Sequence, residues 1–249
     1  MNSFSRFAIC ALLTLSYAIT GLAQTPEEII EKHLAAVGGR TALTKLTSRV
    51  ITGSLVMNSP VGDLQGTVEV YSKSPNKSRT LVKLDVPGIG QIVDDQRFDG
   101  AAGYVTNSFT GNREITGEAL AAMRNGTFPS PLLNYKENGA TLTLAGEEKV
   151  GAKDAYVIRA TPKVGPTVRL FFDKENFMLV KTVTTINVPE LGGAVDQVVE
   201  YSDFKDVEGI KTPYTTKTAN PAQTGVSTVK DVKYNVPIDD SSFLKPAGQ

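Results

Sequence analysis

The side chains that could carry chemistry are few and follow no catalytic spacing. His33 is the one histidine of the chain. On a helical wheel it falls near the middle of an apolar face, among Ile29, Ile30 and Val37, which favours a packed histidine over a ligand or a proton switch. One imidazole does not make a transition-metal site. No serine or cysteine motif accompanies His33, so nucleophilic catalysis lacks its usual partners.

Three pairs of adjacent acids are the other groups to consider: Asp94–Asp95, Glu147–Glu148 and Asp239–Asp240. Each is expected beside a turn, and consecutive residues on a strand point to opposite faces. We therefore interpret all three as solvated turn residues. A carboxylate dyad for hydrolysis would need two acids brought together from distant strands. A hydrolase with such a dispersed site stays open as a third hypothesis.

The first 23 residues have the pattern of a secretory signal peptide. Arg6 supplies a positive charge, residues 7–19 are apolar, and residues 21–23 offer small residues for cleavage after Ala23. The apolar run is too short to span a bilayer. We expect export to the periplasm. The chain's one cysteine, Cys10, lies in this segment, so the exported chain has no disulfide and no cysteine-ligated zinc.

The charge balance narrows the classes of partner. Lys and Arg number 26, and so do Asp and Glu. A nearly neutral chain has no electrostatic footprint for nucleic acid or for an anionic bilayer. No later segment is apolar for long enough to cross a membrane as a helix. An outer-membrane barrel needs an unbroken apolar band on its strands, which Arg159, Arg169 and Lys181 interrupt, so we expect no integral membrane protein. Residues 24–249 suit one sizeable domain, expected to be a monomer without cofactor or metal.

A helix is expected at the start of this domain. Thr25 can cap it, Pro26 suits its first turn, and Glu28 completes a capping box. Residues 38–39, both glycine, should end it. A second short helix is expected at residues 42–46.

From Arg49 onward the apolar period becomes that of strands. Ten or eleven strands in an antiparallel meander are expected, from the runs at residues 49–57, 66–73, 78–86, 90–98, 98–107, 155–162, 167–173, 177–188, 194–204, 210–218 and 227–236. Residues 173–176 and 206–209 suit hairpin turns, with Gly209 supplying a positive φ at a turn with a bulge. Pro213 cannot donate a ladder hydrogen bond, so its strand is expected at an edge or bulged.

An apolar insertion interrupts the strands. Residues 118–124 are expected to be helical, and residues 130–133 to begin another short helix. Several strands also carry apolar residues on both faces, as where Leu170 and Phe172 oppose Phe171. A one-sided sheet would alternate apolar with polar residues. Burial on both faces indicates a curved sheet with helices in its concavity, either as an ordinary core or with an apolar cavity between.

The order and spacing of several segments resemble one known family. They are "HLAAVGGRTALTKLTS", "YSKSPNKSR", "FDGAAGYV", "GAKDAYVIRATP" followed by "RLFFDKENFMLVK", and "EYSDFKDVEGIKTPY" with "NVPIDDSSFLKP" near the end. In these the chain resembles the LolA/LolB-like outer-membrane lipoprotein-sorting proteins over nearly all of residues 24–249. The resemblance implies a mainly β fold, an unclosed antiparallel barrel whose concave face is covered by helices.

The family resemblance also implies a role. In the sorting proteins the apolar cavity shields lipoprotein acyl chains that cross the periplasm. The lipoprotein-shuttling subtype has an arginine before a Pro-Asn pair, which helps to hold its helical lid closed. Here Ser74 stands at that place, preceded by Lys73, and the chain is longer than the compact carriers.

The leading hypothesis is a periplasmic, non-enzymatic carrier or chaperone for the acyl chains of lipoproteins or other lipids, with inner- and outer-membrane envelope proteins as partners. The residues expected to line its cavity are Val68, Val70, Leu81, Val93, Leu120, Met123, Leu132, Leu133, Phe171, Met178 and Val180. An error of one residue in register would move a side chain to the other face. The second hypothesis is an envelope protein-interaction module on the same fold.

Overall fold

Strands dominate the part of the chain that the structure describes. The computed structural model describes residues 24–59, 62–188 and 193–246, and the signal peptide expected at residues 1–23 lies outside them. The first six strands are β1 (Ser48–Ser59), β2 (Gly62–Lys73), β3 (Lys77–Val86), β4 (Gly90–Phe98), β5 (Gly103–Asn107) and β6 (Gly111–Ile115). The other seven are β7 (Thr141–Val150), β8 (Lys153–Thr161), β9 (Val168–Asp173), β10 (Leu179–Val188), β11 (Gly193–Val207), β12 (Ile210–Asn220) and β13 (Gln223–Tyr234).

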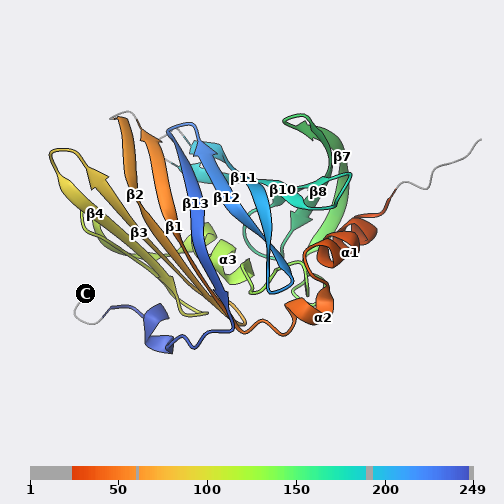
Figure 1. Ribbon diagram of the computed structural model, residues 1–249, viewed down its shortest axis with the longest axis horizontal. Coiled ribbons are helices and arrows are strands. Elements are labelled where there is room, and N and C mark those ends of the chain that lie inside the picture. The colour runs from red at the N-terminus through yellow and green to blue at the C-terminus, as the bar shows by residue number, and fades with distance from the viewer. Residues whose placement is uncertain (1–23, 60–61, 189–192, 247–249) are drawn as a thin grey trace, which may run out of the picture.

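These strands form one antiparallel sheet that curves without closing (Figure 1). Its order is β6-β5-β4-β3-β2-β1-β13-β12-β11-β10-β9-β8-β7. The first and last strands, β1 and β13, therefore pair at its middle, and β6 and β7 are its two edges. The unclosed antiparallel barrel expected from the sequence is confirmed.

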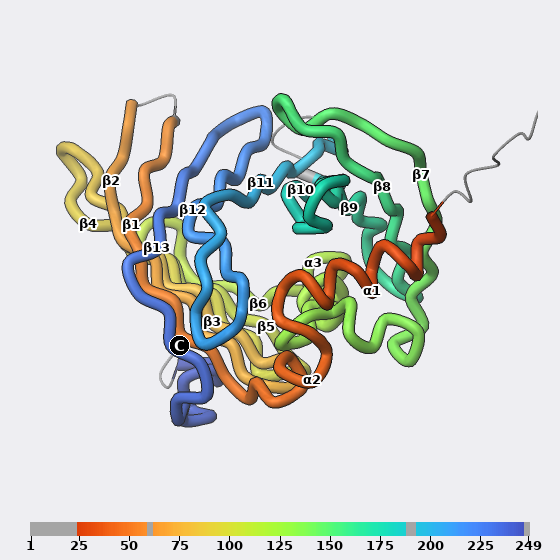
Figure 2. Tube along the Cα trace, turned by 45° about the vertical axis from the view of Figure 1, so that its right-hand side comes forward, coloured from red at the N-terminus to blue at the C-terminus, as the bar shows by residue number. Residues whose placement is uncertain are grey.

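The edge strands β6 and β7 are consecutive in the chain, and the segment between them spans the open side. This segment contains α3 (Gly117–Asn125) and the irregular residues 126–140. Figure 2 shows α1 and α3 within the curve of the sheet. We call α1, α3 and residues 126–140 the cover, and the sheet face beneath them the concave face.

The helix α1 (Pro26–Ala36) forms as the sequence predicts. Thr25 Oγ1 accepts a hydrogen bond from the Glu28 amide at 3.2 Å, and the Glu28 carboxylate accepts one from the Thr25 amide at 3.1 Å. This capping box satisfies two amides that the helix leaves free. Gly38 follows with φ 139°, where a Cβ would meet the carbonyl of Gly209 at 2.7 Å. The next helix, α2 (Arg40–Leu43), begins two residues before the expected range.

The main core lies between the cover and the concave face. It joins Ile29, Ile30 and Leu34 of α1 to Ile158 of β8 and Phe172 of β9, all of them at most 1% exposed. Burying an aliphatic or aromatic side chain of this size contributes about 1.5–3 kcal/mol. The cover is therefore attached mainly by apolar packing.

Two strands were not expected from the sequence, and both are edges. The strand β6 is almost fully exposed, and β7 buries only Leu142 among its ten residues. A strand without a buried face shows no apolar alternation. The count of thirteen strands in the described residues, rather than ten or eleven, follows from these two.

The prediction that a helix begins at residues 130–133 is wrong. The structure has turns there, with the Leu133 amide donating to the Ser130 carbonyl at 3.2 Å. Pro129 and Pro131 lack amide donors, and Ser130 Oγ accepts from the Leu132 amide at 3.2 Å. Leu132 and Leu133 are nevertheless buried in the main core, so the segment is anchored without being helical.

The predicted hairpin at residues 206–209 is confirmed. The strands β11 and β12 are joined by Glu208 and Gly209, with φ 53° and 83°, as a two-residue hairpin turn requires. The expectation of an edge at Pro213 is confirmed locally. The strand β12 lies inside the sheet, but its pairing with β13 begins at Thr215, so Pro213 lies in a stretch that pairs with β11 alone. The β11 ladder also lapses beside Pro213, where Asp203 and Tyr214 do not pair and Asp203 has φ 53°.

The acid pairs differ from one another in their surroundings. Asp239–Asp240, at the start of the 3-10 helix η2 (Asp240–Phe243), is exposed as expected. Glu147–Glu148 is also exposed but lies within β7. Asp94–Asp95 lies inside β4, so a solvated turn is wrong for this pair. Asp95 is 5% exposed.

Asp95 is held by two arginines. Arg79 donates from Nε and Nη2 at 2.8 Å to each carboxylate oxygen, and Arg97 Nη2 donates at 2.7 Å. Burial would raise the pKa of Asp95, but the hydrogen bonds from Arg79 and Arg97 outweigh it and lower this pKa. The carboxylate is thus a structural ion partner that ties β3 to β4.

We predict that Asp95→Asn lowers the free energy of unfolding by roughly 3 kcal/mol, because it leaves two largely buried guanidinium groups without their counter-charge. Chemical denaturation followed by circular dichroism at pH 7 measures this. The matched control is Asp231→Asn, which breaks the exposed 3.5 Å pair with Lys233 and should change the stability by less than about 0.5 kcal/mol. Equal losses in the two variants would contradict the assignment.

Candidate ligand cavity

A cavity of about 580 Å³ lies between the cover and the concave face. It falls within the roughly 300–1,000 Å³ typical of small-molecule sites. Its sheet wall comes from Leu142, Ala160, Val168, Leu170, Leu179, Thr182, Thr184 and Tyr201. Its cover wall includes His33, Ala122, Arg124, Asn125, Gly126, Thr127, Ser130, Pro131, Leu132, Tyr135 and Asn138.

The sheet side of the cavity is apolar with a narrow polar strip. Leu170 and Leu179 lie on neighbouring strands, since Leu179 pairs with Phe172, two residues after Leu170. Thr182, Thr184 and Tyr201 add hydroxyl groups. Burial raises the pKa of Tyr201, against a smaller effect of its hydrogen bond with Thr182. A neutral phenol and two hydroxyls beside aliphatic side chains suit an amphiphile better than an ionic substrate.

His33 contributes to the cavity wall as a packed, neutral side chain. It is 7% exposed, its ring centroid lies 5.0 Å from that of Phe172, and Nδ1 lies 3.0 Å from the carbonyl oxygen of Phe177. A carbonyl only accepts, so Nδ1 carries the proton. Burial lowers the pKa of His33 to about 4, with the Phe177 hydrogen bond acting the other way. The packed histidine expected from the sequence is the one observed.

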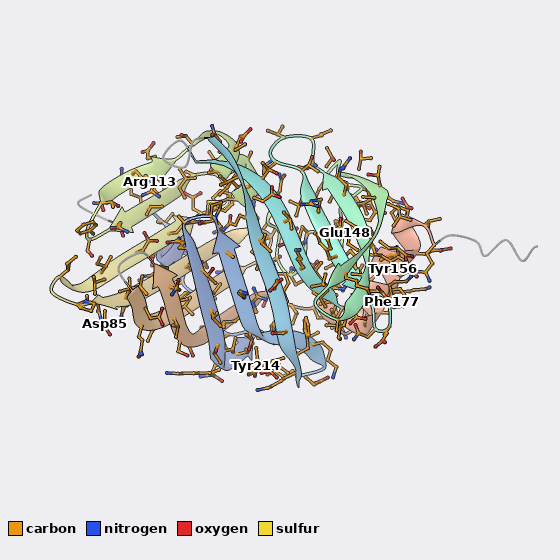
Figure 3. All side chains as sticks on the ribbon, turned by 90° about the horizontal axis from the view of Figure 1, so that it is seen from above. Asp85, Arg113, Glu148, Tyr156, Phe177 and Tyr214 are labelled. Atoms are coloured by element: carbon orange, nitrogen blue, oxygen red, sulfur yellow. The ribbon has the colours of Figure 1, made fainter. Side chains whose placement is uncertain are left out.

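An aromatic pair flanks this end of the sheet beside α1. The rings of Tyr156 and Phe177 are stacked with centroids 6.2 Å apart, and Figure 3 shows them close together. Lys32 of α1 lies 4.8 Å from the Phe177 ring centroid, and Lys174 lies 5.0 Å from that of Tyr156. These contacts help to position α1, and through it His33.

The cover is fastened across the opening by a few polar contacts. Arg124 of α3 donates from Nη2 to the Ala101 carbonyl at 2.8 Å, in the turn between β4 and β5. Asn125 donates to the Val164 carbonyl at 2.8 Å, in the loop between β8 and β9. Consecutive residues of α3 therefore bind both sides of the gap between the sheet edges.

The segment at Ser74 contacts the cover through its backbone. The Phe128 amide donates to the Pro75 carbonyl at 2.8 Å. Lys73 does not replace the arginine of the lipoprotein-shuttling subtype, because its ammonium group donates to the Ile238 carbonyl and to Asp240, each at 2.8 Å. Hydrogen bonds from Lys73 and Lys77 lower the pKa of Asp240 to about 2. Lys73 thus fastens the C-terminal segment, not the cover.

The early strands place the predicted cavity residues on both faces. Val70 pairs with Thr80, Thr80 pairs with Gln96, and the Gln96 amide nitrogen lies 3.8 Å from the Met123 sulfur of α3. Residues paired across a ladder share a face, so Val70 lies on the concave face. Val68, two residues away, does too, but neither borders the 580 Å³ cavity.

Leu81 and Val93 lie on the opposite face. Leu81 pairs with Glu69 and Asp95, and Val93 pairs with Lys83. The expectation that they line a cavity with Val68 and Val70 does not match this geometry. Alternation along each strand is the cause, since one step in register changes the face.

The predicted cover residues lie in the cover. Leu132 borders the cavity, and Leu133 packs in the core beside it. Met123 lies against Gln96 and Gly103, where a Cβ on the glycine would meet its sulfur at 3.3 Å. Leu120 is half-buried in the same helix. Of the eleven predicted residues, Leu132 is the one that lines this cavity.

Phe171, Met178 and Val180 belong to a second apolar cluster. Phe171 pairs with Val157, and the cluster also contains Ala155 and Val183. Phe171 therefore lies on the face opposite to its neighbours Leu170 and Phe172. The residues that the sequence analysis missed are their concave counterparts, above all Leu170 and Leu179. Their apolar alternation was visible in the sequence, but which face is concave was not.

Two further findings limit the chemistry in the described part of the chain. No group of three or more His, Cys, Asp or Glu side chains there is placed to hold a metal ion. No helix in the same ranges is long and apolar enough to cross a membrane.

Comparison with solved structures shows a LolA-like fold. A LolA superfamily protein from Nitrosomonas europaea is 18% identical with a TM-score of 0.56, over 90% of this chain and 99% of that one. A DUF1329 family protein from Desulfovibrio piger is 15% identical with a TM-score of 0.58, over 91% and 100%. A domain from Vibrio parahaemolyticus, assigned as an outer membrane lipoprotein-sorting protein, is 12% identical with a TM-score of 0.54, over 86% and 97%.

Comparison by sequence finds less than comparison by structure. A family model described as "-like: Uncharacterized protein" matches residues 134–247. No curated protein matches the chain. The resemblance seen in the sequence is thus confirmed by structural similarity at the level of the fold.

We predict that His33 makes the fold less stable as the pH falls from about 6.5 to 4. In the unfolded chain the imidazole gains a proton below its ordinary pKa of about 6.5, whereas in the fold it stays neutral to about pH 4. The difference between the two pKa values lowers the free energy of unfolding by about 3 kcal/mol once the pH has fallen to about 4. His33→Asn keeps a donor for the Phe177 carbonyl but cannot titrate, so the variant should lose the part of the pH dependence of stability that comes from His33. Urea unfolding at pH 7, 5.5 and 4.5 measures both proteins, and equal pH slopes would contradict the prediction.

We also predict that Asn125→Ala loosens the cover locally. Loss of one neutral hydrogen bond weakens closure by about 1 kcal/mol, roughly fivefold. Hydrogen–deuterium exchange of residues 117–127 should speed up by that factor while global stability changes little. Asn187→Ala, at an exposed position on β10, is the matched control. Unchanged exchange in the Asn125 variant would show that the contact with the Val164 carbonyl does not hold the cover.

Proposed function

We propose that the protein is a periplasmic carrier that binds acyl chains of lipoproteins or other lipids in the 580 Å³ cavity. Residues 1–23 would direct its export, and it would act by binding and release without turnover. The single observation that carries the proposal is the cavity itself, with its aliphatic sheet wall and its cover of α1, α3 and residues 126–140.

The energetics of chain burial support this function. Each methylene removed from water gains about 0.8 kcal/mol, so a cavity lined by Leu142, Val168, Leu170 and Leu179 can hold a hydrocarbon tail that water cannot. Such binding needs no catalytic residue. It also needs no particular polar pattern, which agrees with a sheet wall of aliphatic side chains and a few hydroxyl groups. The charged and amide groups, Arg124, Asn125 and Asn138, lie on the cover side.

The construction of the cover supports a route for loading and release. Two side chains of α3, Arg124 and Asn125, fasten it to the loops on either side. Surface hydrogen bonds of this kind contribute about 1 kcal/mol each. Opening α3 would therefore expose the cavity without disturbing the strand ladder. Inner- and outer-membrane envelope proteins are the proposed donors and acceptors of cargo, as the name of the structurally similar lipoprotein-sorting domain suggests.

We predict that Ala160→Trp abolishes most lipid retention. Ala160 lies on β8 at the cavity wall, and an indole there would occupy space that the tail needs. The protein, exported and purified from the periplasm, would be extracted with organic solvent and its lipid measured by mass spectrometry. At least a tenfold loss of bound lipid per protein is expected, since about 1.4 kcal/mol of lost affinity gives that factor.

The matched control is Ala194→Trp, at an exposed position on β11 outside the cavity. It should retain lipid at the wild-type level, and thermal unfolding should show both variants folded. Wild-type protein that carries no lipid and binds no fatty acid in vitro would end the carrier proposal. The fold would then be better explained as a scaffold for a protein partner.

A further inference from the structure

Arg49 is a cation on the concave face whose charge is not balanced. It lies on β1, and its Nη2 is 3.5 Å from Ser72 Oγ, a long hydrogen bond. Its guanidinium carbon lies 5.6 Å from the ring centroid of Phe128 in the cover. Its Nε is buried and has no hydrogen-bond partner. Among the described residues, no carboxylate comes within 4 Å of it.

The other half-buried arginines of the described residues do have carboxylate partners. Arg79 and Arg97 share Asp95, and Arg169 lies 3.3 Å from Asp196. Leaving a buried donor unsatisfied destabilises the fold, and more so when the donor is charged. An orphaned donor of this kind calls for an explanation, and a ligand that supplies the missing acceptor is one.

A small pocket adjoins the guanidinium. It measures about 140 Å³ and is lined by Arg49, Phe128, Ser130, Lys211, Thr212 and Tyr234, among others. His33 and Ser130 line both this pocket and the 580 Å³ cavity, so the two spaces are neighbours. The pocket therefore has room for a small polar group.

The polar groups of the pocket favour an anion. Lys211 has Asp206 at 3.4 Å as its partner. The hydroxyls of Thr212 and Tyr234 bind each other at 2.8 Å. His33 is neutral because burial disfavours its charged form, and its Nδ1 proton faces the Phe177 carbonyl. Arg49 is thus the cation in the pocket that lacks a counter-charge, and it stands directly beside a space suited to hydrocarbon.

We infer that Arg49 binds the anionic head group, a carboxylate or a phosphate, of a single-chain amphiphile whose tail lies in the 580 Å³ cavity. This inference rests on the proposed carrier function and narrows its ligand class. A guanidinium matches a carboxylate or phosphate with two parallel hydrogen bonds. A neutral ester, as in an acylated lipoprotein, would accept a hydrogen bond but leave the charge unbalanced.

The test compares three probes that share one tail: hexadecanoic acid, hexadecyl phosphate and hexadecan-1-ol. Dissociation constants would be measured by displacement of a fluorescent fatty acid from wild type, Arg49→Gln and Arg49→Lys. Loss of a charge-assisted pair should weaken the two anionic probes roughly 10- to 100-fold in Arg49→Gln. The alcohol should change less than twofold. Arg49→Lys should fall between, because it keeps the charge but not the planar fork.

The matched control is Lys181→Gln, which removes a cation that lies over Phe171 on the opposite face. It should bind all three probes as the wild type does. Thermal unfolding of each variant establishes that it is folded, and Arg49→Lys provides a second variant should Arg49→Gln fail to fold.

The outcomes separate this inference from the proposed function. An equal loss for all three probes in Arg49→Gln would mean that Arg49 only holds Phe128 and the cover, which overturns the head-group site and leaves the carrier. Wild-type protein that binds none of the probes would overturn both. Inorganic phosphate that binds as tightly as hexadecyl phosphate would identify a free-anion site and overturn the amphiphile.

Discussion

Hydrogen bonds between strands do not close this sheet into a barrel, so its concave face has to be covered by other parts of the chain. Because β1 pairs with β13 at the centre, the ladder runs outward to β6 and β7 and stops there. A fully closed barrel would satisfy both edges and enclose its own interior. Here the concave face is apolar, and the residues between β6 and β7 must cover it. Apolar packing of α1 and residues 126–140 attaches the cover on one side, and Arg124 and Asn125 fasten α3 across the gap.

The two kinds of attachment, apolar packing and hydrogen bonds, explain where the 580 Å³ cavity lies. Packing is dense where α1 meets β8 and β9, with Ile30 and Phe172 fully buried. Toward α3 the cover contributes small or polar residues such as Ala122 and Gly126, which do not fill the volume above Leu170 and Leu179. The cavity is therefore a property of the cover's composition as much as of the sheet's curvature. Arg49 lies nearby, with its guanidinium carbon 5.6 Å from the ring centroid of Phe128 and beside the 140 Å³ pocket.

The sequence predicted the elements better than the assembly. Capping at Thr25, the turn at Gly209 and the open antiparallel barrel all follow from local chemistry or from family resemblance, and all are confirmed. The edge strands were missed because neither buries a face. Which face of a strand is concave depends on partners far along the chain, so Leu81 and Val93 were grouped with Val68 although they lie opposite. The ion partners of Asp95 were likewise hidden, since Arg79 lies on another strand.

The central pairing of β1 with β13 has a consequence for how the chain acquires its structure. One edge of residues 48–59 pairs with the adjacent β2, but the other edge finds its neighbour only at residues 223–234. The ladder that joins the two halves therefore has a very large sequence separation. Contacts of that kind form slowly, and exposed strands awaiting them are prone to aggregate. Within each half, β1 to β6 and β7 to β13, every strand pairs with its neighbour in the chain, so the two halves depend on the β1–β13 pairing to join. Assistance from a folding chaperone would matter most during that interval.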